Sequence, residues 1–257
     1  MKIAKGPWLL WFFFLSMLFV LASEVSAMLS PISSSERKGR NSDSHIFLAQ
    51  TAPDPGELAS YRGLHAAVAK GDISAVRRHI IGGSDLNTRD FHGRTPLMIA
   101  AYRRDNKVAR ALIDAGAKVN ALDSEQYDLW TLAAVLNDVE MVKIAIASGA
   151  DTGLVTSPYQ GTALIAAAHL GHVEVVQTLI TGKAPLDHVN NLGWTALIEA
   201  IVLGDGGPRH EAIVRTLLKA GARANLPDAT GTTPLGLAVQ KGYSNIIHIL
   251  ELAGASR

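Results

Sequence analysis

The sequence predicts an all-α solenoid of six helix-turn-helix units joined by β-hairpin loops, and three observations support this fold class. The segment 58–257 repeats with a period of about 33 residues. A small residue recurs at one position of each unit, and a glycine closes most of them. The repeat is clearest in the motif Gly-x-Thr-x-Leu; its Thr position, called the marker below, falls at Arg62, Thr95, Asp128, Thr162, Thr195 and Thr233.

The residues after each marker predict a short first helix in every unit. Positions two, five and six after the marker share one helical face. The second position holds a large apolar residue: Leu64, Leu97, Trp130, Leu164, Leu197 or Leu235. The fifth holds alanine in all six units: Ala67, Ala100, Ala133, Ala167, Ala200 and Ala238. Alanine there lets the first helices of adjacent units approach closely.

A second helix is expected to follow in each unit, as in Val108–Ile113 and Val173–Ile180. Glycine accepts the left-handed conformation that ends a helix without a steric penalty. The expected terminal glycines are Gly83, Gly116, Gly149, Gly221 and Gly254, and Lys183 takes that place in the fourth unit. No unit can bury its apolar face alone, so the units must stack.

This pattern resembles the ankyrin repeat, which implies a turn, two antiparallel helices and an outward hairpin in each unit. The resemblance covers units at about 58–90, 91–123, 124–157, 158–190, 191–228 and 229–257. The first unit departs from it at Arg62-Gly63-Leu64-His65 and the third at Asp128-Leu129-Trp130-Thr131. Only the first unit keeps the histidine of the motif, as His65.

The N-terminal residues 1–27 have the order of a secretory signal peptide. Lys2 and Lys5 precede an apolar run over 8–22, and the small residues Val25-Ser26-Ala27 follow. This order predicts cleavage after Ala27. An uncleaved membrane anchor is the alternative, although a spanning helix needs about 20 apolar residues. Export without a single cysteine suits a bacterial periplasm; a secreted or membrane-anchored protein is the alternative location.

Residues 28–57 are expected to form a flexible linker. They hold six serines and three prolines and show no sustained apolar period. The apolar run Ile46–Ala49 has two interpretations: it docks on the first unit, or it belongs to a disordered arm.

Composition and motifs argue against a catalytic, metal-binding or cofactor-binding function. The chain has 24 basic and 23 acidic residues and no cysteine, which excludes disulfides and thiol nucleophiles. His210–Val214 lacks the second histidine of a zinc-protease helix, and Gly204–Pro208 lacks the Lys-Ser/Thr of a phosphate loop. His169 and His172 have no third ligand beside them. We expect no catalytic, metal or cofactor site; an enzyme of unknown type is the third-ranked hypothesis.

The resemblance implies a concave binding face made by the hairpin tips and the first helices. The residue before each marker is expected to point outward from a tip, and aromatic and arginine side chains dominate interface energies. The alternative is that tip aromatics pack against the next hairpin. The candidate partner-binding residues are Tyr61, Phe91, His92, Arg94, Tyr102, Arg103, Tyr127, Tyr159, His169, Leu192 and Trp194.

The fifth unit contains an insertion. Thr195 and Gly221 are 26 positions apart, whereas Thr95 and Gly116 are 21 apart. Glycines and a proline in the extra stretch predict a protruding loop at about 206–210. Its candidate contact residues are Asp205, Arg209 and His210; a tolerated insertion without function is the alternative.

Charge is uneven along the repeats. Residues 58–120 hold eleven basic and five acidic residues, and 121–154 hold one basic and six acidic. Mutual balance between neighbouring units and a patch that steers a partner both explain this. The expected function is a non-enzymatic periplasmic scaffold that binds a protein partner of unknown identity. We expect no binding to nucleic acid, no membrane association after signal cleavage, and a monomeric protein. A secreted protein acting on a host-cell protein is the alternative.

Overall fold

The computed structural model describes residues 52–256, which form helices joined by turns and contain no β-strand. The predicted signal peptide and residues 28–51 of the predicted linker lie outside these residues. A short helix, α2 (Pro55–Ser60), precedes the first pair. The pairs are α3 (Gly63–Ala69) with α4 (Ile73–Ile81), α5 (Pro96–Tyr102) with α6 (Asn106–Asp114), α7 (Leu129–Val135) with α8 (Val139–Ala147), α9 (Ala163–His169) with α10 (Val173–Thr181), α11 (Ala196–Val202) with α12 (Pro208–Lys219), and α13 (Pro234–Lys241) with α14 (Ser244–Leu252).

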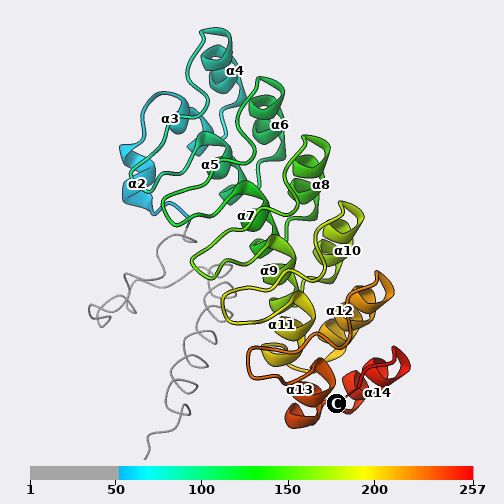
Figure 1. Ribbon diagram of the computed structural model, residues 1–257. Helices are drawn as coiled ribbons and strands as arrows, with labels where there is room; N and C mark the ends of the chain where they lie inside the picture. The colour runs from blue at the N-terminus through cyan, green and yellow to red at the C-terminus, as the bar shows by residue number, and fades with distance from the viewer. Residues whose placement is uncertain (1–51, 257) are drawn as a thin grey trace, which may run out of the picture. The chain divides into compact units, whose positions relative to one another are not determined.

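The helix pairs stack side by side, with the first helices in one layer and the second helices in another (Figure 1). At the position five after the marker, the alanines are almost fully buried between adjacent first helices. Trp130, two residues after its marker, is 1% exposed. The predicted helix contacts are therefore confirmed, and the core runs through the stack as one continuous cluster.

The marker residue is the N-cap of each first helix. In every unit but the first, where the marker is Arg62, its side-chain oxygen accepts a hydrogen bond from the backbone N–H three residues on, which satisfies a donor that the helix leaves free. Aspartate performs this task as well as threonine, so Asp128 fits the third unit without strain. The markers that cap in this way are Thr95, Asp128, Thr162, Thr195 and Thr233.

The second helices end as predicted. Gly83, Gly116, Gly149, Gly221 and Gly254 all adopt positive φ, between 72° and 100°. Lys183 adopts the same conformation, with φ 64°, although a side chain there meets the steric penalty that glycine avoids. The fourth unit thus keeps the geometry of the others and carries local backbone strain.

Lys183→Gly is expected to raise the free energy of unfolding by about 1 kcal/mol, because it removes this strain. Urea unfolding followed by circular dichroism measures the change. Lys143→Gly, on the exposed face of α8, is the matched control and should instead lower stability by about 0.5–1 kcal/mol. Equal effects of the two substitutions would contradict the assignment of strain to Lys183.

The hairpins between units are loops closed by backbone hydrogen bonds, and most are braced by an acidic or amide side chain. In the second unit the N–H of Asp90 donates to the carbonyl of Arg94. Asp90 Oδ1 also accepts from the N–H groups of His92 and Arg94, at 2.9 and 2.8 Å. Asp123, Asn190 and Asp228 repeat this brace five residues before their markers. The loop before the fourth unit closes through a single bridge between Thr156 and Gly161.

The end of the predicted linker is helical. Asp54 accepts a hydrogen bond from the N–H of Glu57, and Glu57 accepts one from the N–H of Asp54, which forms a capping box. Pro55 at the first helical position favours the same start. Residues 54–57, which were predicted to belong to the flexible linker, therefore form the start of α2.

Candidate functional site

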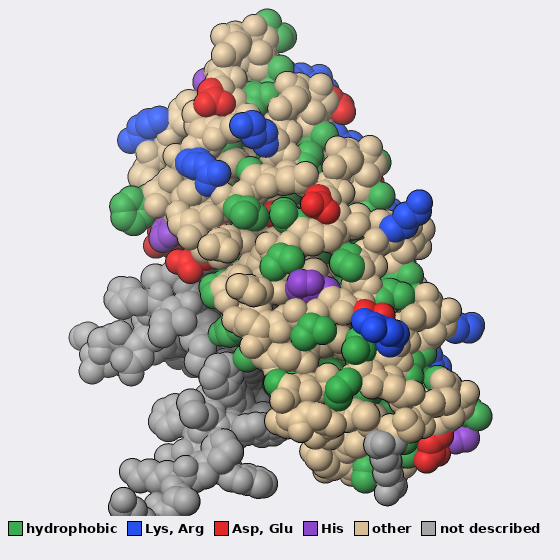
Figure 2. All heavy atoms as spheres, viewed as in Figure 1, with side chains coloured by type: hydrophobic (Ala, Val, Ile, Leu, Met, Phe, Trp, Pro, Cys, Tyr) green, Lys and Arg blue, Asp and Glu red, His purple; other side chains and the backbone are tan. Residues whose placement is uncertain are grey.

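A row of partly exposed leucines lies along the first helices. The residue eight after each marker stands at or beside the end of the first helix: Lys70, Arg103, Leu136, Leu170, Leu203 and Lys241. A cation there complements the helix dipole, whereas leucine does not. We call Leu136, Leu170 and Leu203 the leucine row; Leu136 and Leu170 contribute to neither hydrophobic cluster of the described residues. Hydrophobic side chains gather over α7, α9 and α11 (Figure 2).

A buried polar pair lies beside the leucine row. His169 is the last residue of α9, with a side chain 17% exposed, and its Nδ1 is 3.8 Å from Glu199 Oε2 on α11. Asn190 Nδ2 donates to Glu199 Oε1 at 2.9 Å, and Oε2 has no hydrogen-bond partner. Glu199 occupies a position that is apolar in the other units, which is the sequence signal that would have revealed it.

Burial makes both members of this pair neutral at pH 7. Desolvation raises the pKa of Glu199 to about 8, partly offset by the hydrogen bond from Asn190. Desolvation, helped by the charges of His210 and His172, lowers the pKa of His169 to about 4. The separation of 3.8 Å would suit an ion pair, but removing two charges from water outweighs their attraction here. The leucine row is therefore an apolar surface that adjoins a polar pair, His169 and Glu199, without net charge on either side chain at pH 7.

Two of the predicted tip residues point inward, which corrects the expectation that residues before the markers project. Arg94 is 2% exposed, and Tyr127 is also buried, packed with Met98 and Leu132. The hairpin brace holds the backbone of both residues, but it does not by itself bury the side chain, since Trp194 has the same brace and is half-buried. Arg94 contacts Glu57 and Tyr61, and Tyr127 packs on helix residues of its own and the preceding unit, not on the next hairpin.

The remaining candidates differ in exposure. Phe91 is 96% exposed, and Arg103 is also exposed. The side chains that are half-buried are Tyr61, His92, Tyr102, Tyr159, His169, Leu192 and Trp194. Burial raises the pKa of Tyr102 and Tyr159 above the usual range, so both phenols stay neutral. The candidates thus range from fully exposed to half-buried, whereas the leucine row repeats one residue type at one position of three successive units.

The insertion in the fifth unit lengthens both the second helix and the turn before it, which corrects in part the prediction of a protruding loop at 206–210. Pro208 and Arg209 begin α12, which has 12 residues where α4, α6, α8 and α10 have 9. Proline suits the first position of a helix, since no partner is needed for its nitrogen. His210 is buried: its Nε2 contacts the His169 carbonyl at 3.0 Å, and its Nδ1 contacts Asp205 Oδ1 at 2.8 Å.

Comparison with known families settles the classification. The family model described as "Ankyrin repeats (3 copies)" matches residues 64–153 and 129–228. The chain belongs to the ankyrin-repeat family. Ankyrin repeats bind protein partners, so the described domain is an interaction scaffold.

Bacterial ankyrin proteins are among its similar relatives. The ankyrin repeat protein YahD of Escherichia coli (strain K12) is 36% identical over 190 residues, covering 74% of this chain and 94% of that protein. A solved ankyrin repeat domain from Acinetobacter baumannii AYE is 44% identical with a TM-score of 0.71, covering 75% of this chain and 98% of that one. The solved ankyrin domain of Bcl-3 is 28% identical with a TM-score of 0.71, covering 77% and 88%.

The acidic stretch of this ankyrin domain is mostly internal. Asp123, Asp128 and Asp138 are buried; Asp123 braces a hairpin and the other two cap α7 and α8. Glu140 is exposed and pairs with Arg110 at 2.5 Å, between neighbouring second helices. These contacts favour charge balance within the stack over an acidic patch that steers a partner.

Two kinds of feature are absent from residues 52–256. No helix there has the length and apolar character needed to cross a membrane. No group of three or more His, Asp or Glu side chains in that range is arranged to hold a metal ion.

Proposed function

We propose that this ankyrin-repeat protein is a non-enzymatic scaffold, exported to the bacterial periplasm, that binds a protein partner on the face formed by its first helices. The observation that carries the proposal is the leucine row. Solvent-exposed helix ends in the same stack carry Lys70 and Arg103, so the position itself tolerates charge. Leu136 and Leu170 leave part of their apolar side chains exposed without packing in the core, as interaction sites do, whereas Leu203 also packs against the core.

The neighbours of the row support the same proposal. His169 and the buried Glu199 place a polar centre beside the leucines, while Arg103 stands at one end of the row and Lys241 at the other. Interfaces commonly combine an apolar core with a polar rim. The partner expected here covers Leu136, Leu170 and Leu203 with apolar side chains.

Leu136→Arg combined with Leu170→Arg is expected to abolish partner capture while leaving stability within about 0.5 kcal/mol, because arginine occupies the equivalent position in the second unit. Capture from extracts of the source organism, quantified by mass spectrometry, measures the loss. Gln177→Arg, on the exposed side of α10, is the matched control. Undiminished capture by the double variant would refute the assigned surface.

The predicted export can be tested separately in the same cells. A basic n-region, an apolar run and Val25-Ser26-Ala27 support cleavage after Ala27. Fractionation should recover the protein with periplasmic contents, with Met28 as its N-terminal residue. Recovery from culture fluid would instead favour a secreted protein that acts on a host-cell protein, and an intact Met1 in membranes would favour an anchor.

A further inference from the structure

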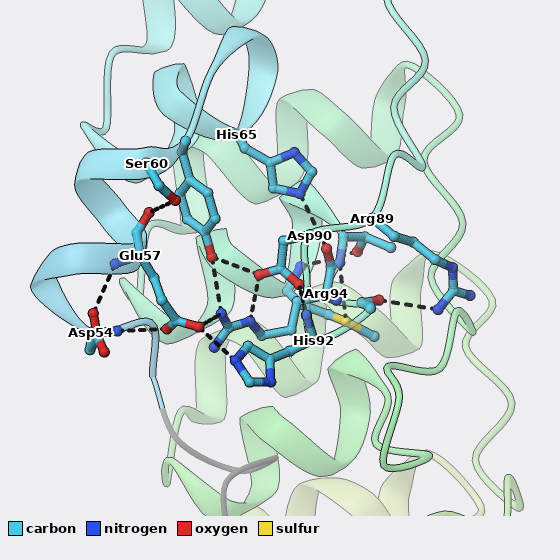
Figure 3. A network of polar contacts seen from close by, with 12 residues as sticks. Asp54, Glu57, Ser60, His65, Arg89, Asp90, His92 and Arg94 are labelled. Carbon is cyan, nitrogen blue, oxygen red and sulfur yellow. Dashed lines mark hydrogen bonds and ion pairs between the residues drawn. The ribbon is translucent and has the colours of Figure 1, made fainter.

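Two side chains of the Asp90–Arg94 hairpin converge on one carboxylate oxygen that comes from outside the repeats. Arg94 Nη2 is 3.0 Å and His92 Nε2 is 2.7 Å from Glu57 Oε1 of α2 (Figure 3). Tyr61, which follows α2, donates from its hydroxyl to Asp90 Oδ2 at 2.7 Å. Helix α2 therefore occupies a two-donor carboxylate site that belongs to the second repeat.

The hairpin does not need Glu57 to compensate its buried arginine. Arg94 Nε is 2.7 Å from Asp90 Oδ2, and these side chains are 2% and 4% exposed. Asp90 Oδ1 is held by two backbone N–H groups of the same hairpin. Because one carboxylate already balances the guanidinium, Glu57 is a second anion that the site accepts through the remaining face of Arg94 and through His92.

Helix α2 lies at the surface of the domain. None of the six residues of α2 is buried, and the Glu57 side chain is 26% exposed. Leu58 of α2 and Tyr61, which follows it, pack partly buried against the core. A competing carboxylate from another protein can approach on the exposed side of Glu57, and it must replace the contacts of Glu57 with Arg94 and His92.

An exposed aromatic adjoins the site. The Phe91 ring contacts the His92 ring edge-on, with centroids 5.4 Å apart, yet it is 96% exposed. Helix α2 leaves this ring uncovered. A ligand larger than α2 can use it, since buried aromatic side chains contribute strongly to interfaces.

We propose that Arg94 and His92 form a binding site for an acidic side chain of a partner protein, and that α2 is its displaceable internal occupant. The partner presents a glutamate or aspartate from a helical segment, as α2 presents Glu57, and covers Phe91. This proposal rests on the proposed function only in taking the ligand to be a protein. The leucine row is a separate surface, so either proposal can fail alone.

The test uses the mature chain, its Glu57→Lys variant and a synthetic peptide of residues 52–61, with a second peptide in which Glu57 is replaced by glutamine. The lysine introduced at position 57 is repelled by the guanidinium of Arg94, so α2 is expected to leave the site. The glutamate peptide is expected to bind the variant about ten-fold tighter than it binds the unmodified chain, and the glutamine peptide to lose that gain. Glu140→Lys, which breaks the exposed pair with Arg110, is the matched control and should bind like the unmodified chain.

A second measurement guards against misfolding of the variant. In the unmodified chain, amide exchange of residues 54–61 should accelerate when the glutamate peptide is added and stay unchanged with the glutamine peptide, while the Asp90–Arg94 hairpin stays protected. Equal binding of the two peptides, equal binding to the two chains, or unchanged exchange at 54–61 would each overturn the proposal. Loss of capture on the leucine row tests the proposed function independently.

Discussion

Trp130→Ala is expected to lower the free energy of unfolding by about 3–5 kcal/mol. The indole fills the place that leucine fills in the other repeats, and 1% of it is exposed. Removing it leaves a cavity between adjacent first helices that small alanines cannot close. Urea unfolding of the mature chain measures the loss as a lower midpoint.

Trp130→Leu separates cavity formation from the identity of the residue. Leucine restores the side chain of the neighbouring repeats and removes the indole Nε1–H, which is buried without a hydrogen-bond partner. We expect a cost below about 1.5 kcal/mol, since the lost volume is offset by removal of the unsatisfied donor. Trp194→Ala, at a half-buried indole, should also cost less than Trp130→Ala. Equal losses for all three variants would contradict the packing described for the third unit.

Glu199 is expected to make the domain less stable as pH rises. Its native pKa, about 8, lies above the ordinary value of 4.5, so the native state keeps a proton that the unfolded state has released. The stability that this group contributes is complete below pH 4.5 and is lost as pH rises to 8. The total is about 4–5 kcal/mol, at 1.36 kcal/mol for each pH unit.

The shifted pKa of His169 changes stability in the opposite direction, because it makes the domain less stable as pH falls. Its pKa falls from 6.5 to about 4, so its contribution is present above pH 6.5 and is lost as pH falls to 4. Between pH 6.5 and 8 only the Glu199 effect remains, and it should lower stability by about 2 kcal/mol. Glu199→Gln should remove this slope, while Glu211→Gln, the control on α12, should keep it. A slope unchanged in Glu199→Gln would show that Glu199 is ionised in the native state.

The sequence predicted the parts of the fold that depend on local periodicity. The marker, the alanine five residues later and the terminal glycine each report one backbone or packing requirement, so aligning them located the helices. Lys183 shows the limit of this reasoning, because its neighbours impose a left-handed backbone that its own side chain disfavours. The spacing of the repeat predicted a left-handed helix end at position 183, whereas the residue type, lysine, did not.

The site was harder to predict because exposure depends on contacts between repeats. Arg94 and Tyr127 were expected to project from hairpin tips, but both side chains are buried in contacts with residues outside their own hairpins. The insertion looked like a loop because of Gly206, Gly207 and Pro208, whereas Pro208 starts a helix whose third residue, His210, is buried. Two signals were readable, namely leucine at one position in three successive repeats and Glu199 at a position that is apolar in the other units.

Site-specific photo-crosslinking in the source organism tests the central claim most directly. A benzoylphenylalanine at Leu170 lies on the face of the first helices, and one at Gln177 lies on the exposed side of α10. The scaffold account predicts a discrete cross-linked protein from position 170 and none from position 177. A cross-link from position 177 alone, or none from either position, would contradict it.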